Sequence, residues 1–393
     1  MKRQMTKKNI IRLVVAFTFL LLYIALLCYA NRGWDGYDIT ESTGVEYETA
    51  KVVKVIEDTT VKDETIEGRR RGRMLLRLEL LSGRYKGDVV LAENYLSAMY
   101  NVYVLEGDKV SVRIDTVGAN EYQVSIYNYE RSPVIVGMVA AFAIALILIG
   151  GWQGFRAFLG LIFAFINVMF LLLPLTLKGF SALPLTMALV ALTSVVSYYL
   201  LGGWQAKTIG ASIGCLCGVG FAAVFGAIAA DMTHITAYQM DEAEALILTM
   251  SNTNLKLKGL FLSGILISTV GATMDTAMSV ASAMDEIKIK IPDIGLKELF
   301  LSGMKVGRDA TGTMANTLVL AFAGASLNMA LLIYSYDVSY NQLMNTDFIV
   351  VEVVRGIAGS MGIIMTVPCV AIVTALVLQK RKSINVHKIS CRK

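Results

Sequence analysis

The chain has 393 residues, of which 55% are hydrophobic and only 17% charged. Soluble domains carry about 25% charged residues, and several apolar runs here reach the roughly 20 residues that cross a hydrocarbon core. The composition therefore predicts an integral membrane protein. The net charge of +5 comes mostly from basic residues beside the apolar runs, so we expect no nucleic acid partner.

Apolar runs in chain order predict an α-helical polytopic protein with eight transmembrane helices. The first run follows a basic head and is longer than the apolar core of a usual signal peptide, so we expect an uncleaved anchor helix. Basic residues also follow the last run, which predicts that both termini are cytoplasmic, and an even number of spans agrees. The eight predicted spans are residues 10–29, 133–150, 157–175, 182–201, 208–230, 258–280, 311–334 and 351–379.

About 100 polar residues separate the first two spans and contain short alternating runs with turn signals between them. This spacing predicts a small extracytoplasmic β-rich domain, with an OB-like barrel as the first choice. No cysteine falls within it, which excludes a disulfide framework there. The run GRRRGR (68–73) predicts a solvated hairpin turn rather than a ligand site. The strand-like runs are residues 45–56, 73–82, 85–91, 109–115 and 121–127.

These patterns divide the chain into four parts. Residues 1–30 form the cytoplasmic basic head and first helix, and residues 31–131 the extracytoplasmic β-rich domain. Residues 132–379 form a seven-helix bundle, and residues 380–393 a basic cytoplasmic tail.

The sixth span contains the carboxylate Asp275 in the run GATMDTAMSVASAMDEIK (271–288). A charged side chain facing lipid at the centre of a helix costs at least about 2.5–3.5 kcal/mol. Asp275 should therefore face other helices or water. One hypothesis is an ion, proton or substrate ligand, helped by Ser279 and the neighbouring Thr273 and Thr276. The alternatives are a structural carboxylate bonded to a neighbouring helix and a carboxylate that reaches the wet membrane interface.

The seventh span opens with GRDATGTMANTL (307–318) and carries Asp309, Thr313 and Asn316 on one face. Since the sixth and seventh spans run in opposite directions, the two carboxylates could lie at similar depth on adjacent helices. Carboxylate, hydroxyl and amide oxygens suit a hard cation or a proton. Arg308 argues instead for a plain ion pair, so the metal question stays open.

The fifth span has small residues at every fourth position, including Gly210, Gly214, Gly218 and Gly226, which predicts close helix packing. The stretch GASIG (210–214) matches the serine nucleophile elbow, but the elbow needs a histidine partner. The chain has two histidines, one in a predicted loop and one in the tail. There is also no H-E-x-x-H and no Walker A sequence. We therefore expect no enzyme, no catalytic residue and no cofactor.

The eighth span opens with a possible charge pair, Glu352 and Arg355, three residues apart on one helix. Such a pair can compensate its own charges near the membrane interface. We interpret it as structural.

The segments ATMDTAMSVASAMDEI (272–287) and SGMKVGRDATGTMANTL (302–318) resemble the signature of the YibE/F-like membrane-protein family. Similar stretches are LLSGRYKGDVVLAEN (80–94), DMTHIT (231–236) and VRGIAGSMGIIMTVP (354–368). The resemblance implies a bacterial multi-spanning protein of the cell membrane and brings no activity with it.

Two functions remain open from the sequence. The first is a permease, or transport-related protein, that passes a small solute or ion along the acidic site of spans six and seven. The alternative is a non-transporting sensor or assembly factor whose outer β-rich domain binds a protein partner. The substrate, the direction of transport, the coupling ion and oligomer formation are not given by the sequence.

Overall fold

The computed structural model describes residues 7–32, 44–97, 99–116, 122–240, 243–249 and 259–390. The predicted basic head before residue 7 and the last three tail residues lie outside these ranges. The chain divides into two compact units: Gly33–Ala145, which we call the β unit, and Met1–Arg32 with Leu146–Lys393, which we call the helical unit.

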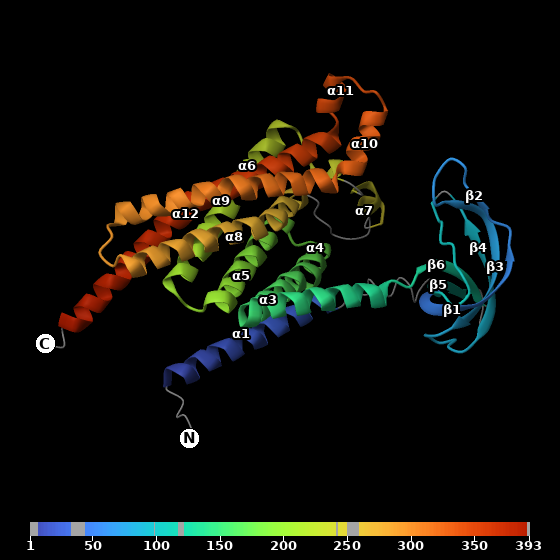
Figure 1. The fold of residues 1–393 in the computed structure, drawn as a ribbon, viewed down its shortest axis with the longest axis horizontal. Helices are drawn as coiled ribbons and strands as arrows, with labels where there is room; N and C mark the ends of the chain where they lie inside the picture. Colours follow the sequence, from blue (N-terminus) through green and yellow to red (C-terminus); the bar gives the residue numbers. More distant parts are fainter. Residues whose placement is uncertain are drawn as a thin grey trace. The chain divides into compact units, whose positions relative to one another are not determined.

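The β unit is a six-stranded antiparallel sheet among the described residues (Figure 1). The hydrogen-bonded order is β2-β3-β1-β5-β6, and β4 pairs with β3. Four strands (β1, β3, β5 and β6) coincide with predicted runs to within a few residues, β4 overlaps the predicted run 85–91 only at residues 89–91, and the short β2 was not predicted. The strands are β1 (Val45–Asp58), β2 (Val61–Lys62), β3 (Arg70–Leu80), β4 (Val89–Leu96), β5 (Lys109–Thr116) and β6 (Tyr122–Tyr129).

The sheet curves around its own hydrophobic core, because alternate residues of each strand point inward. In β3 the buried positions are Met74, Leu76, Leu78 and Leu80. Register shifts in β1 bend the sheet, as bulges do. The β-rich prediction is confirmed. The OB-like barrel stays a prediction, because no hydrogen-bonded ladder joins the end strands β4 and β6 in the described part of the chain.

Gly72 shows why a glycine stands in the middle of the arginine run. Its φ of 132° is unfavourable for other residues, and a Cβ there would lie 2.7 Å from the carbonyl oxygen of Thr59. The close approach of the two backbones lets β3 continue from the β2 pairing into the β1 pairing.

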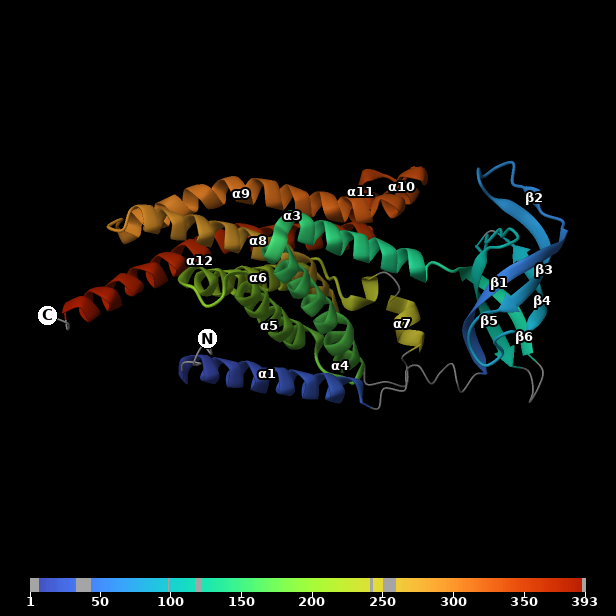
Figure 2. The same cartoon turned by 60° about the horizontal axis from the view of Figure 1, so that its bottom comes forward.

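The helical unit is built from long apolar helices (Figure 2). Helix α3 is shared, because its residues 132–145 group with the β unit. The elements are α1 (Lys7–Asn31), α3 (Ser132–Ile166), the π-helical turn η1 (Asn167–Leu172), α4 (Leu173–Leu177), α5 (Ala182–Gly202), α6 (Ala206–Met232), η2 (Ala237–Gln239), α7 (Ala243–Thr249), α8 (Leu260–Lys290), α9 (Leu296–Ala325), α10 (Leu327–Ser335), α11 (Tyr340–Met344) and α12 (Asp347–Ser390).

Five helical segments of the described chain are long and apolar enough to span a membrane, or six if the bent pair of α9 and α10 counts as one span. The predicted eight helices are not reached by this count and stay a prediction. Three features explain why fewer spans are counted than the eight predicted. The described apolar part of α1 is short (Phe17–Asn31), α9 and α10 meet at 58°, and Ser132–Leu177 forms one 46-residue run. That run contains two predicted spans and breaks its helical geometry at Gly151 (φ 54°).

The centre of the helical unit is formed by α6, α8 and α12, with α5 and α9 packed around them. Small buried residues such as Ala211, Ala277 and Ala371 let the helix axes approach closely. This arrangement fixes which faces of α8 and α9 are covered and which remain open.

Candidate functional site

Helices α8 and α9 are antiparallel neighbours joined by a short turn (Figures 1 and 2). Two contacts define their register. A methyl group placed on Gly303 of α9 would lie 3.1 Å from Met284 Cγ of α8. One placed on Gly359 of α12 would meet Leu318 of α9 at 2.7 Å and Thr269 of α8 at 2.8 Å. The two helices therefore keep one register over this whole stretch.

This register places the two predicted carboxylates at nearly the same height. Asp275 lies six residues after Thr269, and Gly312 lies six residues before Leu318, so Asp275 is level with Gly312. Asp309 is three residues away from Gly312, which corresponds to about 4.5 Å along the helix. Asp275 is also the midpoint of α8, about 22 Å from either end of that helix.

Asp275 is exposed on one side of α8, and its carboxylate interacts electrostatically with Tyr198 of α5. The same face carries Ser279, which is exposed, and Ser268, which is half-buried. Gly264 and Gly271 also lie on it, and a Cβ on either would meet no atom within 4 Å. We call these five residues the open face of α8. They share one side because they recur at three- and four-residue steps.

Asp309, Thr313 and Asn316 lie on the outer side of α9, where all three are exposed. Gly312 has open space beside it, and Arg308 is exposed as well. We call these five residues the open face of α9. The opposite side of the helix packs inward through four buried residues, Leu299, Gly303, Gly307 and Leu318.

The structure separates Thr273 and Thr276 from Asp275. Both threonines are fully buried, and their hydroxyls donate within α8, from Thr273 to Val270 O (2.9 Å) and from Thr276 to Ala272 O (2.9 Å). Their hydroxyl groups are therefore used by the helix itself. Of the predicted site residues, five lie on open faces and these two point into the bundle.

The interior of the bundle holds polar contacts that the sequence analysis did not find. Tyr198 of α5 donates its hydroxyl to Met274 O of α8 (2.9 Å), and the Cys215 thiol of α6 donates to Thr273 Oγ1 (3.6 Å). Ser194 lies 3.9 Å from the same thiol. The signal that could have shown them is the spacing of Ser194 and Tyr198, which places two hydroxyls on one helix face.

A second interior chain links α1, η1 and α5. Tyr23 donates to Asn167 Oδ1 and Asn167 donates to Thr193 Oγ1, both at 2.9 Å. Asn167 is 1% exposed and opens the π-helical turn. Such turns are frequent at functional sites. The sequence feature that could have pointed to this one is the single asparagine, Asn167, within an apolar run.

Three of the four predicted packing glycines of α6, Gly210, Gly214 and Gly218, lie against α12 and leave no room for side chains. We call this contact the α6/α12 seam. A Cβ on Gly214 would lie 2.6 Å from Val370 Cα, and one on Gly218 would lie 2.8 Å from Gly362 O. Gly210 meets Thr374, and Gly226 meets α8 and α12 through Leu262, Ile265 and Ala358. Small residues at four-residue steps thus bring the two backbones into contact.

Glu352 and Arg355 form an ion pair within α12, and their side chains are 14% and 20% exposed. Arg355 Nε is buried and has no hydrogen-bond partner in the described part of the chain. Removing either member of such an enclosed ion pair would leave the other charge buried without compensation.

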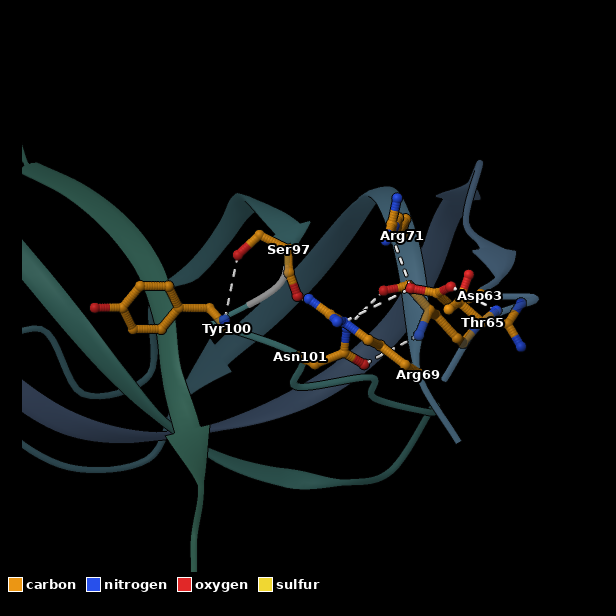
Figure 3. A network of polar contacts seen from close by, with 8 residues as sticks. Asp63, Thr65, Arg69, Arg71, Ser97, Tyr100 and Asn101 are labelled. Atoms are coloured by element: carbon orange, nitrogen blue, oxygen red, sulfur yellow. Dashed lines mark hydrogen bonds and ion pairs between the residues drawn. The ribbon is translucent and has the colours of Figure 1, made fainter. Parts of the chain in front are cut away.

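In the β unit the arginine run is folded back on itself rather than fully solvated (Figure 3). Asp63, 4% exposed at its side chain, accepts from Arg71 Nε (2.9 Å) and the backbone N–H of Thr65 (3.0 Å). These partners lower the pKa of Asp63, the Thr65 bond most. Arg69 is 14% exposed at its side chain, and its Nε and Nη2 have no hydrogen-bond partner among the described residues. The prediction of a hairpin turn is correct for Gly68 and Arg69, which lie between β2 and β3, and wrong for residues 70–73, which already belong to strand β3. The expected solvation holds best for Arg71, 62% exposed.

The carboxylates of Asp275 and Asp309 make no hydrogen bond or ion pair with any described residue. A charge at mid-helix facing lipid costs at least about 2.5–3.5 kcal/mol. In a bilayer the two open faces must therefore meet water, a solute or another protein surface. Within the described residues no three His, Cys, Asp or Glu side chains are grouped as a metal site would need.

The long apolar helices and their small-residue packing define a multi-spanning α-helical membrane protein. Residues 138–380 match the model of the YibE/F-like protein family, and the chain belongs to this family. The match covers the helical unit from Leu146 to residue 380 and both acidic segments, while α1 and the resembling stretch at 80–94 lie before it. No curated protein and no solved structure matches the chain.

Proposed function

We propose that this protein is a membrane permease in which Asp275 and Asp309 contact the transported solute or ion. The observation that supports the proposal is a pair of exposed mid-helix carboxylates on neighbouring helices, within one helical turn in height, that make no hydrogen bond or ion pair with any described residue. Intramembrane carboxylates of this kind commonly mark ion and proton paths. The proposal assigns no catalytic residue.

The proposed orientation has both termini in the cytoplasm of a bacterial cell and the β unit outside. In the helical unit, the start of α1 and the end of α12 lie toward the same end (Figure 2), which an even number of spans requires. Reporter fusions after residue 390 and within the β unit test the orientation.

Flux measurements on the full chain in liposomes test the permease. Because the solute is unidentified, the first probes are protons, followed with a pH-sensitive dye, and then Na⁺, K⁺ and Mg²⁺. We expect Asp275→Asn and Asp309→Asn each to lower flux at least tenfold. Asp347→Asn, at the exposed first turn of α12, is the matched control. Equal flux in all three variants and the wild type would exclude this role for the carboxylates.

A second candidate is a sensor or assembly factor that binds a protein partner through the β unit. The observation that favours it is a row of exposed apolar side chains on the end strand β4: Val89, Leu91 and Tyr95 are 58%, 60% and 61% exposed. Exposed rows on end strands can pair with another chain. Deleting residues 35–128 discriminates the two functions, since a permease should keep flux and a sensor should lose its partner.

A further inference from the structure

We infer that the open faces of α8 and α9 pack against a second copy of this chain, so that two protomers enclose one acidic site. The inference rests on the proposed function, because it says what completes the site around Asp275 and Asp309. In one protomer these carboxylates lie on the outside of the bundle and not within it.

The first support is the kind of residue that the open face of α8 presents. Gly264, Ser268, Gly271 and Ser279 surround Asp275, and the two glycines face open space. Lipid-facing surfaces gain nothing from small polar residues, whereas helix–helix contacts in membranes are enriched in them. The α6/α12 seam shows how this same chain uses such a pattern, with Gly210, Gly214 and Gly218 each against the backbone of α12.

The second support is charge complementarity between the two faces. The open face of α8 carries Asp275, and the open face of α9 carries Arg308, which has no ion pair within the described protomer. Arg308 is four residues from Gly312, so it lies about 6 Å in height from Asp275. An arginine side chain spans such a step.

A two-fold axis along the membrane normal keeps every residue at its own height. In such a dimer, Asp275 of one copy meets Arg308 of the other across a height difference of about 6 Å. The two-fold axis makes this contact occur twice. Asp309 then lies beside this pair, facing the partner copy. The surface formed by the two open faces is thus self-complementary, as an isologous dimer requires. For this reason we assign it to a second copy of the chain.

Bulky substitutions at the open glycines test the interface without disturbing the protomer. Gly271→Trp and Gly312→Trp place side chains where the protomer has free space, and Gly220→Trp on α6, which also faces open space, is the matched control. Copies of the full chain per lipid nanodisc are counted by single-molecule photobleaching. We expect dimers for the wild type and the control, and at least a tenfold weaker dimer for the two open-face variants.

A charge exchange tests the pairing itself. Asp275→Arg alone should weaken the dimer at least tenfold, and adding Arg308→Asp should restore it. A monomeric wild type would overturn the inference, and so would open-face variants that dimerise like the control. A purified monomer that pairs only with a different protein would overturn it as well.

The two proposals fail separately. A wild-type dimer whose flux is unaffected by Asp275→Asn and Asp309→Asn overturns the permease and leaves the dimer standing. Full flux from monomeric Gly271→Trp overturns the shared site and leaves the permease standing.

Discussion

The α6/α12 seam and the open faces of α8 and α9 use the same residue types for opposite situations. Gly214 and Gly218 lie where a Cβ would strike the backbone of α12, whereas Gly271 and Gly312 have nothing within 4 Å. The seam carries no charge, while the open faces carry two carboxylates and an arginine. The small-residue stripe of the seam is thus a contact filled within the protomer, whereas the contact on the open faces is the one that we infer for a second copy.

The largest expected effect is at the seam. Gly214→Leu forces a side chain against Val370, whose backbone N lies 2.8 Å from the added Cβ position, so the helices must separate. We expect a loss of about 3 kcal/mol or more in the free energy of unfolding, as for severe overpacking. Chemical unfolding in detergent measures it.

Gly220→Leu on the same helix is the control, because it points into open space and should change stability by less than about 0.5 kcal/mol. If both variants were equally stable, the seam would not be the closed contact described here.

The next largest effect on stability is expected at the ion pair of Glu352 and Arg355, in which both charges are paired within the protomer. Asp275, by contrast, makes no ion pair with any described residue. Glu352→Gln leaves Arg355 without its carboxylate at a position 20% exposed. We expect a loss of about 2–3 kcal/mol, below the range for a fully buried pair. The double variant Glu352→Gln with Arg355→Met should recover part of it in a double-mutant cycle, and no recovery would mean that the two residues act independently.

The sequence predicted the packing face of the α6/α12 seam better than it predicted the open faces of α8 and α9. Four-residue steps at Gly210, Gly214 and Gly218 define a packing face, but periodicity cannot name the partner helix, which depends on how α12 crosses α6. Connectivity predicted the similar height of Asp275 and Asp309, because antiparallel neighbours share a register. The exposure of both could not be predicted, since it depends on α12 occupying the inner side of α8 and α9.

A smaller effect tests whether the β unit is independent of the seam. The Thr60 hydroxyl and backbone N–H donate to Asp58 and, with Tyr103, lower the pKa of that carboxyl. A lowered folded pKa contributes stability above the unfolded value of about 3.9, and this is lost as the pH falls through the folded pKa. We expect the β unit to loosen below about pH 4.

Hydrogen exchange of residues 45–129 in the full chain, followed against pH, measures this transition. Asp58→Asn should flatten the acid dependence. Gly214→Leu should leave it unchanged, because the β unit has its own core. A shifted transition in Gly214→Leu would show that the two units are coupled.

The smallest effect on stability is expected on the open face of α9. Asp309→Asn removes a charge that makes no hydrogen bond or ion pair with any described residue, so the protomer loses no contact. We expect the free energy of unfolding in dilute detergent to change by less than about 0.5 kcal/mol, although the same variant should lower flux at least tenfold. A loss above about 2 kcal/mol would instead show that Asp309 stabilises the protomer, and the open face would then have to be regarded as a second structural contact like the seam.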